Sequence, residues 1–223
     1  NRNIAQSRKS FNLTNSRLKN EDLVVFRKLR KFSSNQSSLS VILYSHSYNY
    51  LPYEKKLALR EVAAIPQIRY VSLKPNEISI TLPKKYKSKL KDLVYFYSFQ
   101  VGNGNIEKTL QAKLENGTTS EIRAKKKQAT RYGVHGLHDY KGKFNPQIVR
   151  GILNTYGIDS SSRVLDPFCG SGTTLIESTI AGSQSIGWDL NPFAIYLSNA
   201  KISILHSHPD KLSILSKNIL SRY

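Results

Sequence analysis

The fold class is indicated most clearly by residues 163–175, Arg163-Val-Leu-Asp-Pro-Phe-Cys-Gly-Ser-Gly-Thr-Thr-Leu175. Residues 163–166 have the pattern of a short buried strand, and residues 174–181 place apolar side chains at helical spacing. Between them lies a loop whose glycines, Gly170 and Gly172, let the backbone approach a ligand closely. A strand, a glycine loop and a helix in this order open a doubly wound α/β sheet, where ligands bind at the carboxyl ends of the strands.

A second strand is predicted over residues 184–189, and it ends in an acid. This acid, Asp189, follows Gly172 by 17 residues. That is close to the spacing of roughly 20 residues at which an acid reaches the ribose hydroxyls of a bound nucleoside. Asn191 is then expected to cap a helix that has Pro192 at its first position. The two strands and their loops therefore predict a crevice for a nucleoside.

The glycine loop lacks the features of two common nucleotide-binding motifs. It has no Lys before a Ser or Thr, as a Walker loop requires, and Leu175 stands where a dinucleotide fingerprint has its third Gly. Instead, residues 166–174 and the Gly-Trp-Asp-Leu-Asn-Pro of residues 187–192 resemble motif I and the ribose-binding acid of class I, S-adenosylmethionine-dependent methyltransferases. More narrowly, they resemble the DNA amino-methyltransferases that form N4-methylcytosine or N6-methyladenine.

Residues 135–150 are similar to motif X of the same family, in which His-x-Tyr-x-x-Lys-Phe-x-Pro precedes a helix. The resemblance covers about residues 130–205 and implies part of a Rossmann-like, doubly wound methyltransferase sheet. It places motif X and the glycine loop at the methionine part of the cofactor, Trp188 beside the adenine and Asp189 on the ribose. The expected cofactor-binding residues are Lys143, Phe144, Pro146, Asp166, Phe168, Gly170, Ser171, Gly172, Thr173, Thr174, Trp188 and Asp189.

Two features of such an enzyme are missing from the sequence. Only two strands of the sheet are recognisable, and two parallel strands with one crossover do not make a stable doubly wound domain alone. The family's Asp/Asn/Ser-Pro-Pro-Tyr/Phe tetrapeptide, which holds the amine of a flipped base, does not occur. The catalytic residues are therefore expected beyond Tyr223 or on a partner chain. A start at Asn1 and the absence of Met also indicate a fragment.

Positive charge is concentrated in the N-terminal part of the chain, whose net charge is +19 overall. Residues 1–130 hold 25 Lys and Arg against 9 Asp and Glu, whereas residues 131–223 hold 9 against 6. A polyanion partner accounts for this distribution, because phosphate contacts supply most non-specific affinity for nucleic acid. A solvated basic surface is the alternative. The expected phosphate contacts are Lys84, Lys85, Lys87, Lys89, Lys91, Arg123, Lys125, Lys126 and Lys127.

Aromatic residues lie beside the first basic run, and one apolar helical stripe is expected there. The stripe comprises Leu90, Leu93, Val94 and Tyr97. The aromatics could stack on bases, but we favour the interpretation that they form the core while the lysines face water. They are Tyr86, Tyr95, Phe96, Tyr97 and Phe99.

The sequence predicts a small basic α+β domain ahead of the methyltransferase part. The expected domains are a polar arm and helix over residues 1–37, a basic nucleic-acid-binding region over 38–130, and the incomplete cofactor-binding domain over 131–223. The expected elements are helices over 20–32, 53–65, 106–115, 148–156 and 193–205, a strand over 40–45, a hairpin of 67–73 with 77–82, and a last helix capped by Asp210.

Composition limits the remaining possibilities. There is no secretory signal and no run of 18 apolar residues, so neither export nor a membrane span is expected. Cys169 is the only cysteine, and we expect a small loop residue rather than a nucleophile; cytoplasmic residence is the natural default. His135 and His138 lack a third ligand at a suitable spacing, so no metal site is expected.

The predicted function is transfer of a methyl group from S-adenosylmethionine to the exocyclic amine of cytosine (N4) or adenine (N6) in DNA, as in restriction-modification. One alternative is a tRNA guanosine N2-methyltransferase, a class that also pairs a basic RNA-binding module with Asp-Pro-Phe-Cys-Gly. Another is a non-catalytic subunit of a split methyltransferase that binds cofactor and nucleic acid. The choice of base, the target sequence and the oligomeric state stay open.

Overall fold

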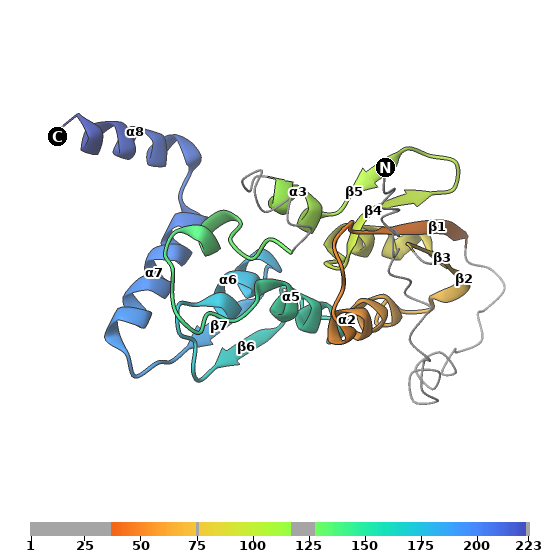
Figure 1. The fold of residues 1–223 in the computed structure, drawn as a ribbon, viewed down its shortest axis with the longest axis horizontal. Coiled ribbons are helices and arrows are strands. Elements are labelled where there is room, and N and C mark those ends of the chain that lie inside the picture. The colour runs from red at the N-terminus through yellow and green to blue at the C-terminus, as the bar shows by residue number, and fades with distance from the viewer. Residues whose placement is uncertain (1–36, 75, 117–127, 222–223) are drawn as a thin grey trace, which may run out of the picture. The chain divides into compact units, whose positions relative to one another are not determined.

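The computed structural model describes residues 37–74, 76–116 and 128–221, which form two units (Figure 1). Unit 1 comprises residues 37–113, and unit 2 comprises residues 114–116 and 128–221. Some predictions fall outside the described residues. They are the polar arm and helix over residues 1–37, apart from residue 37, and the second basic run, namely Arg123, Lys125, Lys126 and Lys127.

Unit 1 is an antiparallel sheet of five strands in the order β2-β3-β1-β4-β5. The predicted strand over 40–45, the helix over 53–65 and the hairpin are confirmed. The elements are β1 (Ser38–Ser45), α2 (Pro52–Ala63), β2 (Arg69–Lys74), β3 (Glu77–Pro83), the 3-10 helix η1 (Lys84–Asp92), β4 (Phe96–Val101) and β5 (Ile106–Lys108).

The core of unit 1 follows from alternation along its strands. Val41 and Leu43 of β1 are buried while their neighbours are less so, and β3 repeats the pattern through Leu82. Each fully buried side chain of this kind contributes roughly 1.5–3 kcal/mol. The core also contains Tyr95, Phe96 and Phe99, whereas Lys84, Lys85, Lys87, Lys89 and Lys91 are exposed. The interpretation that these three aromatics are core and the lysines face water is therefore confirmed.

Two predictions in unit 1 are wrong in part. Only Leu90 of the expected helical stripe lies in a helix, because η1 ends at Asp92, Leu93 and Val94 follow it, and Tyr97 lies in β4. The buried Glu61 carboxylate accepts the Val94 and Tyr95 amides at 2.9–3.1 Å, and these bonds are not those of a continuing helix. The first part of the expected helix over 106–115 is instead the strand β5, which pairs with β4. The helix itself, α3, covers only Leu110–Asn116.

Unit 2 contains two parallel strands and the helices that follow each of them. The predicted strand, glycine loop and helix are confirmed, as is the second strand, although it ends two residues earlier than expected. The elements after α3 are η2 (Gly133–Gly136), α5 (Pro146–Thr155), β6 (Arg163–Asp166), α6 (Thr173–Ile180), β7 (Gln184–Gly187), α7 (Pro192–His206) and α8 (Pro209–Leu220).

Helix starts in unit 2 mostly follow the local signals in the sequence. The Asn191 side chain accepts the Phe193 amide at 3.0 Å and Pro192 is the first residue of α7, as predicted. The cap of α8 was expected at Asp210 but lies at His208, because Pro209 takes the first helical position and the His208 side chain accepts the Asp210 amide.

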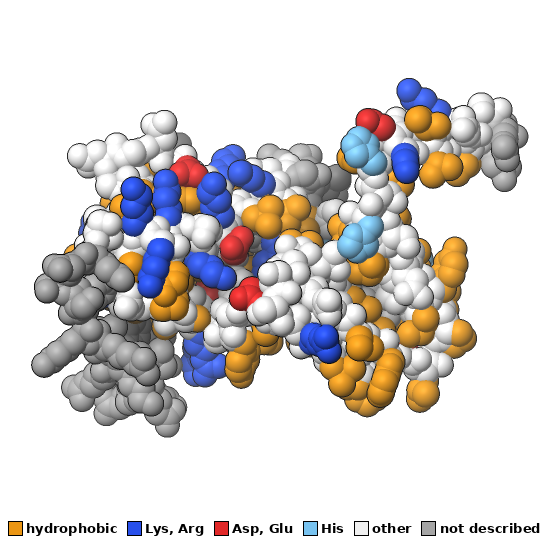
Figure 2. Space-filling model, turned by 180° about the vertical axis from the view of Figure 1, so that it is seen from behind, with side chains coloured by type: hydrophobic (Ala, Val, Ile, Leu, Met, Phe, Trp, Pro, Cys, Tyr) orange, Lys and Arg blue, Asp and Glu red, His pale blue; other side chains and the backbone are white. Residues whose placement is uncertain are grey.

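Unit 2 exposes apolar side chains on its small sheet. Leu165 of β6 and Ile186 of β7 are 59% and 60% exposed, and α8 has no buried residue. In the space-filling view, hydrophobic side chains gather over this part of the chain (Figure 2). No helix among the described residues is long and apolar enough to cross a membrane.

Candidate cofactor site

The glycine loop between β6 and α6 folds back over the ends of both strands. The Trp188 amide donates to Asp166 O at 2.9 Å, and the Cys169 amide donates to Trp188 O at the same distance. Gly172 has a φ of +83°, and a Cβ added there would lie 2.7 Å from Ser198 Cβ on α7. Only glycine meets both conditions at the start of α6.

A cavity of about 450 Å³ lies between this loop and the segment that resembles motif X. Its apolar wall includes Val149 and Leu153 of α5 and Val164 of β6. The structure therefore brings together two motifs that are separate in the sequence, and the cavity has a size usual for small-molecule sites. Eight predicted cofactor residues line it: Lys143, Phe144, Asp166, Phe168, Gly170, Ser171, Thr173 and Thr174.

The other four predicted cofactor residues stand outside the lining of this cavity. Pro146 is buried as the first residue of α5, Gly172 caps α6, and the Trp188 side chain is 64% exposed. Asp189 accepts the Gly170 amide at 2.8 Å and the Asn191 amide at 2.9 Å, so it fastens the loop to the start of α7. Each carboxylate oxygen can accept a further hydrogen bond.

Lys143 is hydrogen-bonded to the backbone at the start of the motif X segment and just before it. Its Nζ donates to Thr130 O at 2.8 Å and to His135 O at 3.0 Å. Burial, together with the positive charges of Lys201 and Arg131, lowers the pKa of Lys143 to about 8, although the nearby Asp139 carboxylate opposes this shift. An ammonium has three donors, so one proton of Lys143 is not committed to these two carbonyls.

A buried carboxylate that the sequence analysis missed joins motif X to the glycine-loop helix. Glu177 of α6 is fully buried and accepts from Arg150 Nε at 2.6 Å, His135 Nε2 at 2.7 Å and Tyr132 OH at 3.1 Å. Burial would raise the pKa of Glu177, but the Arg150 charge and the bonds from His135 and Tyr132 outweigh it and hold the pKa below its usual value. The sequence did contain a signal for this buried carboxylate, because Glu177 is an acid among the apolar residues Leu175, Ile176 and Ile180 of the predicted helix.

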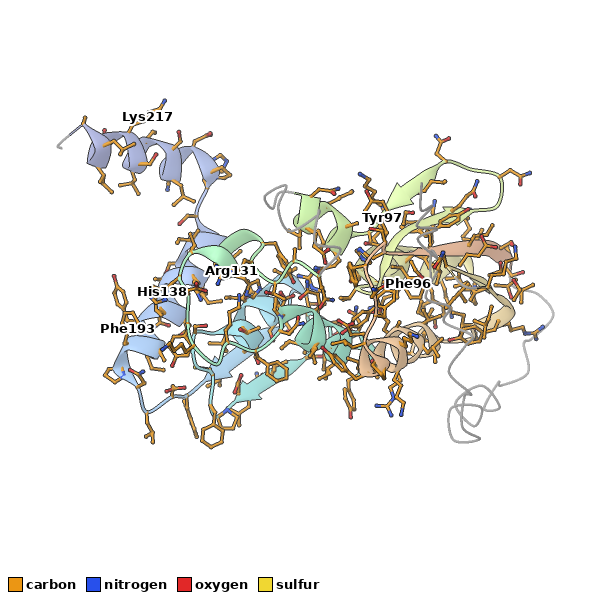
Figure 3. All side chains as sticks on the ribbon, viewed as in Figure 1. Phe96, Tyr97, Arg131, His138, Phe193 and Lys217 are labelled. Atoms are coloured by element: carbon orange, nitrogen blue, oxygen red, sulfur yellow. The ribbon has the colours of Figure 1, made fainter. Side chains whose placement is uncertain are left out.

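The histidines and the cysteine of this region have separate environments. His135 is bound to Glu177, whereas the exposed His138 packs edge-on against Phe193 with ring centroids 5.4 Å apart (Figure 3). The described residues contain no group of three His, Cys, Asp or Glu that could hold a metal ion. Burial, Asp166 and Asp189 raise the pKa of the Cys169 thiol, which disfavours the reactive thiolate.

The described part of the predicted phosphate-contact surface lies on η1. Its five lysines are exposed, with Lys87 and Lys91 at 4.0 and 3.8 Å from the Glu107 carboxylate and Lys85 over the Tyr86 ring. Lys and Arg side chains gather over unit 1 in the space-filling view (Figure 2). Ion pairs this long and exposed are weak, so they leave the lysines available to another anion.

Comparison with known proteins adds independent evidence. A family model described as DNA methylase (N6_N4_Mtase) matches residues 2–200. The type II methyltransferase M.MjaII of Methanocaldococcus jannaschii is 42% identical over 76 residues, which cover 34% of this chain and 14% of that protein. The type II methyltransferase M.BsoBI of Geobacillus stearothermophilus is 30% identical over 86 residues, covering 39% and 17%.

Two further similarities are weaker. The tRNA (guanine(10)-N2)-dimethyltransferase of Methanothermobacter thermautotrophicus is 38% identical over 52 residues, which cover 23% of this chain and 16% of that protein. The matches thus span less than a fifth of each of these curated relatives. A solved structure described as a possible methylase from Clostridium difficile 630 has a TM-score of 0.30 at 12% identity, covering 66% of this chain and 56% of that one.

Proposed function

Because the chain belongs to the DNA methylase family, whose type II methyltransferases use S-adenosylmethionine as methyl donor, we propose that it binds this cofactor in the cavity of unit 2. The proposed reaction of the whole protein is methylation of the exocyclic amine of cytosine (N4) or adenine (N6) in DNA. The observation that carries the proposal is that motif X and the glycine loop, 20 or so residues apart, face each other across one cavity.

The residues around the cavity fit the parts of this cofactor. Ser171 Oγ is buried without a hydrogen-bond partner among the described residues, and Ser171 lines the cavity. The amides at the start of α6 have no partner inside the helix and suit a carboxylate. We assign the methionine part to this loop and Lys143, the ribose to Asp189 and the adenine to the side of Trp188. The cofactor supplies an activated methyl group, and these residues bind and orient it.

The lysines of η1 are proposed to contact DNA phosphates. They are exposed on one short helix, and their Glu107 partner is too distant and too exposed to neutralise them. The sequence similarity to a tRNA methyltransferase over 52 residues supports RNA as the second candidate substrate. The two substrates differ in the nucleoside that would be modified.

Product analysis separates these functions. The complete natural protein would be incubated with methyl-labelled cofactor and either DNA or tRNA, and the nucleic acid digested to nucleosides. We expect N4-methylcytosine or N6-methyladenine from DNA. Labelled N2-methylguanosine from tRNA alone would replace the DNA proposal, and cofactor binding without transfer would support a non-catalytic subunit.

The assignment of Asp189 has its own test. We expect Asp189→Ala to weaken cofactor binding by about 1–3 kcal/mol, because it removes a charged hydrogen-bond acceptor and loosens the loop. Asp210→Ala, on the exposed α8, is the matched control and should leave the affinity unchanged. Calorimetry would measure both, and unchanged affinity in Asp189→Ala would remove this residue from the site.

A further inference from the structure

Lys201 occupies an unusual position on α7. The helix buries one face made of Ala194, Leu197, Ser198 and Lys201, and the lysine side chain is only 2% exposed. Taking an ammonium out of water costs several kcal/mol unless a partner compensates for it. A lysine on this face therefore requires an explanation that its small and apolar neighbours do not.

A hydrogen bond joins Lys201 to the wall of the cavity. Its Nζ donates to Ser171 O at 3.2 Å, and the packing of Gly172 against Ser198 brings α7 directly against this loop. Ser171 itself is 3% exposed, and its Oγ has no partner among the described residues. The ammonium of Lys201 thus hydrogen-bonds to the loop on the side away from the cavity. The Ser171 hydroxyl beside the cavity has no hydrogen-bond partner among the described residues.

The carboxylates around the loop have partners other than Lys143 and Lys201. Glu177 is bonded to Arg150, His135 and Tyr132. Asp166 accepts the Phe168 amide, and Asp189 accepts the amides of Gly170 and Asn191. No carboxylate of the described residues lies within 4.0 Å of the ammonium of Lys143 or Lys201. Burial is the main cause of the lowered pKa of Lys143, and the charge of Lys201 is the next. The two ammonium groups are therefore close enough to repel each other. The carboxylate of a ligand bound at the loop would supply the negative charge that these two ammonium groups do not find in an ion pair.

We propose that Lys201 is a positioning residue of the cofactor site, which holds the Ser171 carbonyl and adds to Lys143 a second positive charge for the carboxylate of the methionine part. This inference rests on the proposed function. Lys201 stands one layer behind the cavity lining, so it acts on the ligand through the loop and through its charge. Its contribution should therefore depend on whether the ligand carries a carboxylate.

Two ligands that differ in this group make the test. Calorimetry on the complete protein would compare S-adenosylmethionine with its decarboxylated form in the native protein and in Lys201→Met. We expect Lys201→Met to bind S-adenosylmethionine at least tenfold more weakly and to change the affinity for the decarboxylated form by less than threefold. Lys201→Arg, which keeps the charge, should recover most of the loss. Lys217→Met is the matched control, because Lys217 is exposed on α8 (Figure 3).

The outcomes are distinct. Equal losses for both ligands, or no loss for S-adenosylmethionine, would overturn the role of Lys201 while leaving the proposed function intact. Failure of the native protein to bind S-adenosylmethionine would instead remove the proposed function. If urea unfolding shows that Lys201→Met does not fold, the affinities for the two ligands would be compared in Lys201→Gln and Lys201→Arg instead. A neutral Gln that binds both ligands as the native protein does would also overturn the proposal.

Discussion

The two units differ in the charges that they bury. Unit 1 packs an apolar core that includes the buried acids Glu54 and Glu61, and it carries the lysines of η1 on its surface. Unit 2 buries Glu177, Arg150 and Lys201 and exposes Leu165 and Ile186. Burying an acid or a base costs free energy unless hydrogen bonds or an opposite charge compensate for the lost water. The two units differ in which groups supply this compensation.

Buried polar groups occur in both units, but their partners differ. In unit 1, Glu61 accepts the Val94 and Tyr95 amides and His46 bonds to Val94 O, so each fixes a short length of backbone. In unit 2, Glu177 binds side chains from η2, α5 and the residue before η2. Loss of a buried polar group should therefore remain local in unit 1 and spread over several elements in unit 2.

The largest expected effect is that of Glu177→Ala. It leaves Arg150 buried without its carboxylate, which should destabilise unit 2 by about 3–5 kcal/mol. Urea unfolding followed by tryptophan fluorescence reports on this unit, because Trp188 is the only tryptophan of the chain. Glu107→Ala, on the exposed β5, is the control and should cost less than about 1 kcal/mol. Equal costs for the two variants would break the contrast between buried and surface charge.

Local signals predicted much of the architecture, and long-range contacts account for what was missed. Glycine, proline and asparagine positions located the loop after β6 and the start of α7, because these residues restrict the backbone where they stand. The hydrogen-bond partners of Glu177 and Lys201 were not predictable, since the partner of a helix face depends on which elements pack there. The end of η1 was not predictable for the same reason. The amides of Val94 and Tyr95, just after it, bond to Glu61, which lies 33 residues before Val94 in the sequence.

The second prediction concerns pH and unit 1. Burial lowers the pKa of His46 to about 4 from an ordinary 6.5. The unfolded chain therefore binds a proton between these values that the folded chain excludes, and stability falls as pH falls through this window. The difference between the two pKa values of His46 corresponds to a loss of roughly 3 kcal/mol in unfolding free energy between pH 7 and pH 4. In unit 2, the stabilisation from the lowered pKa of Glu177 is lost only as the pH falls below the ordinary glutamate pKa near 4.5.

Hydrogen exchange of peptides from β1 and β4 would follow this loss in unit 1. His46→Gln should remove most of the pH dependence above pH 4.5, because the substituted residue does not titrate. His208→Gln, at the exposed start of α8, is the matched control. A native-like pH profile in His46→Gln would show that other groups govern the acid sensitivity of unit 1.

A smaller difference, roughly 2 kcal/mol between two glycine variants, is expected from the tight contact between the glycine loop and α7. Gly172 and Gly182 have φ values of +83° and +79°, but only Gly172 has atoms near the site of an added Cβ. Gly182→Ala should cost about 1–2 kcal/mol for its backbone conformation. Gly172→Ala should cost roughly 2 kcal/mol more through overpacking against Ser198, and it should also weaken cofactor binding. Equal unfolding free energies would show that α7 yields to the added methyl group.

The smallest effect on stability is expected for the surface lysines of unit 1. Lys84, Lys85 and Lys89 are exposed and make no ion pair among the described residues, so replacing all three with Gln should change the unfolding free energy by less than about 0.5 kcal/mol. If they contact phosphates, the logarithmic salt dependence of DNA binding should become shallower by roughly 0.9 for each lysine.

Three exposed lysines of unit 2 give the matched control for this measurement: Lys141, Lys211 and Lys217. Fluorescence anisotropy with duplex DNA at several salt concentrations would compare the two triple variants. Equal changes in slope would mean that DNA responds to the net charge of the chain rather than to the η1 surface. A change confined to the η1 variant would assign phosphate contact to unit 1, because both variants lose the same charge.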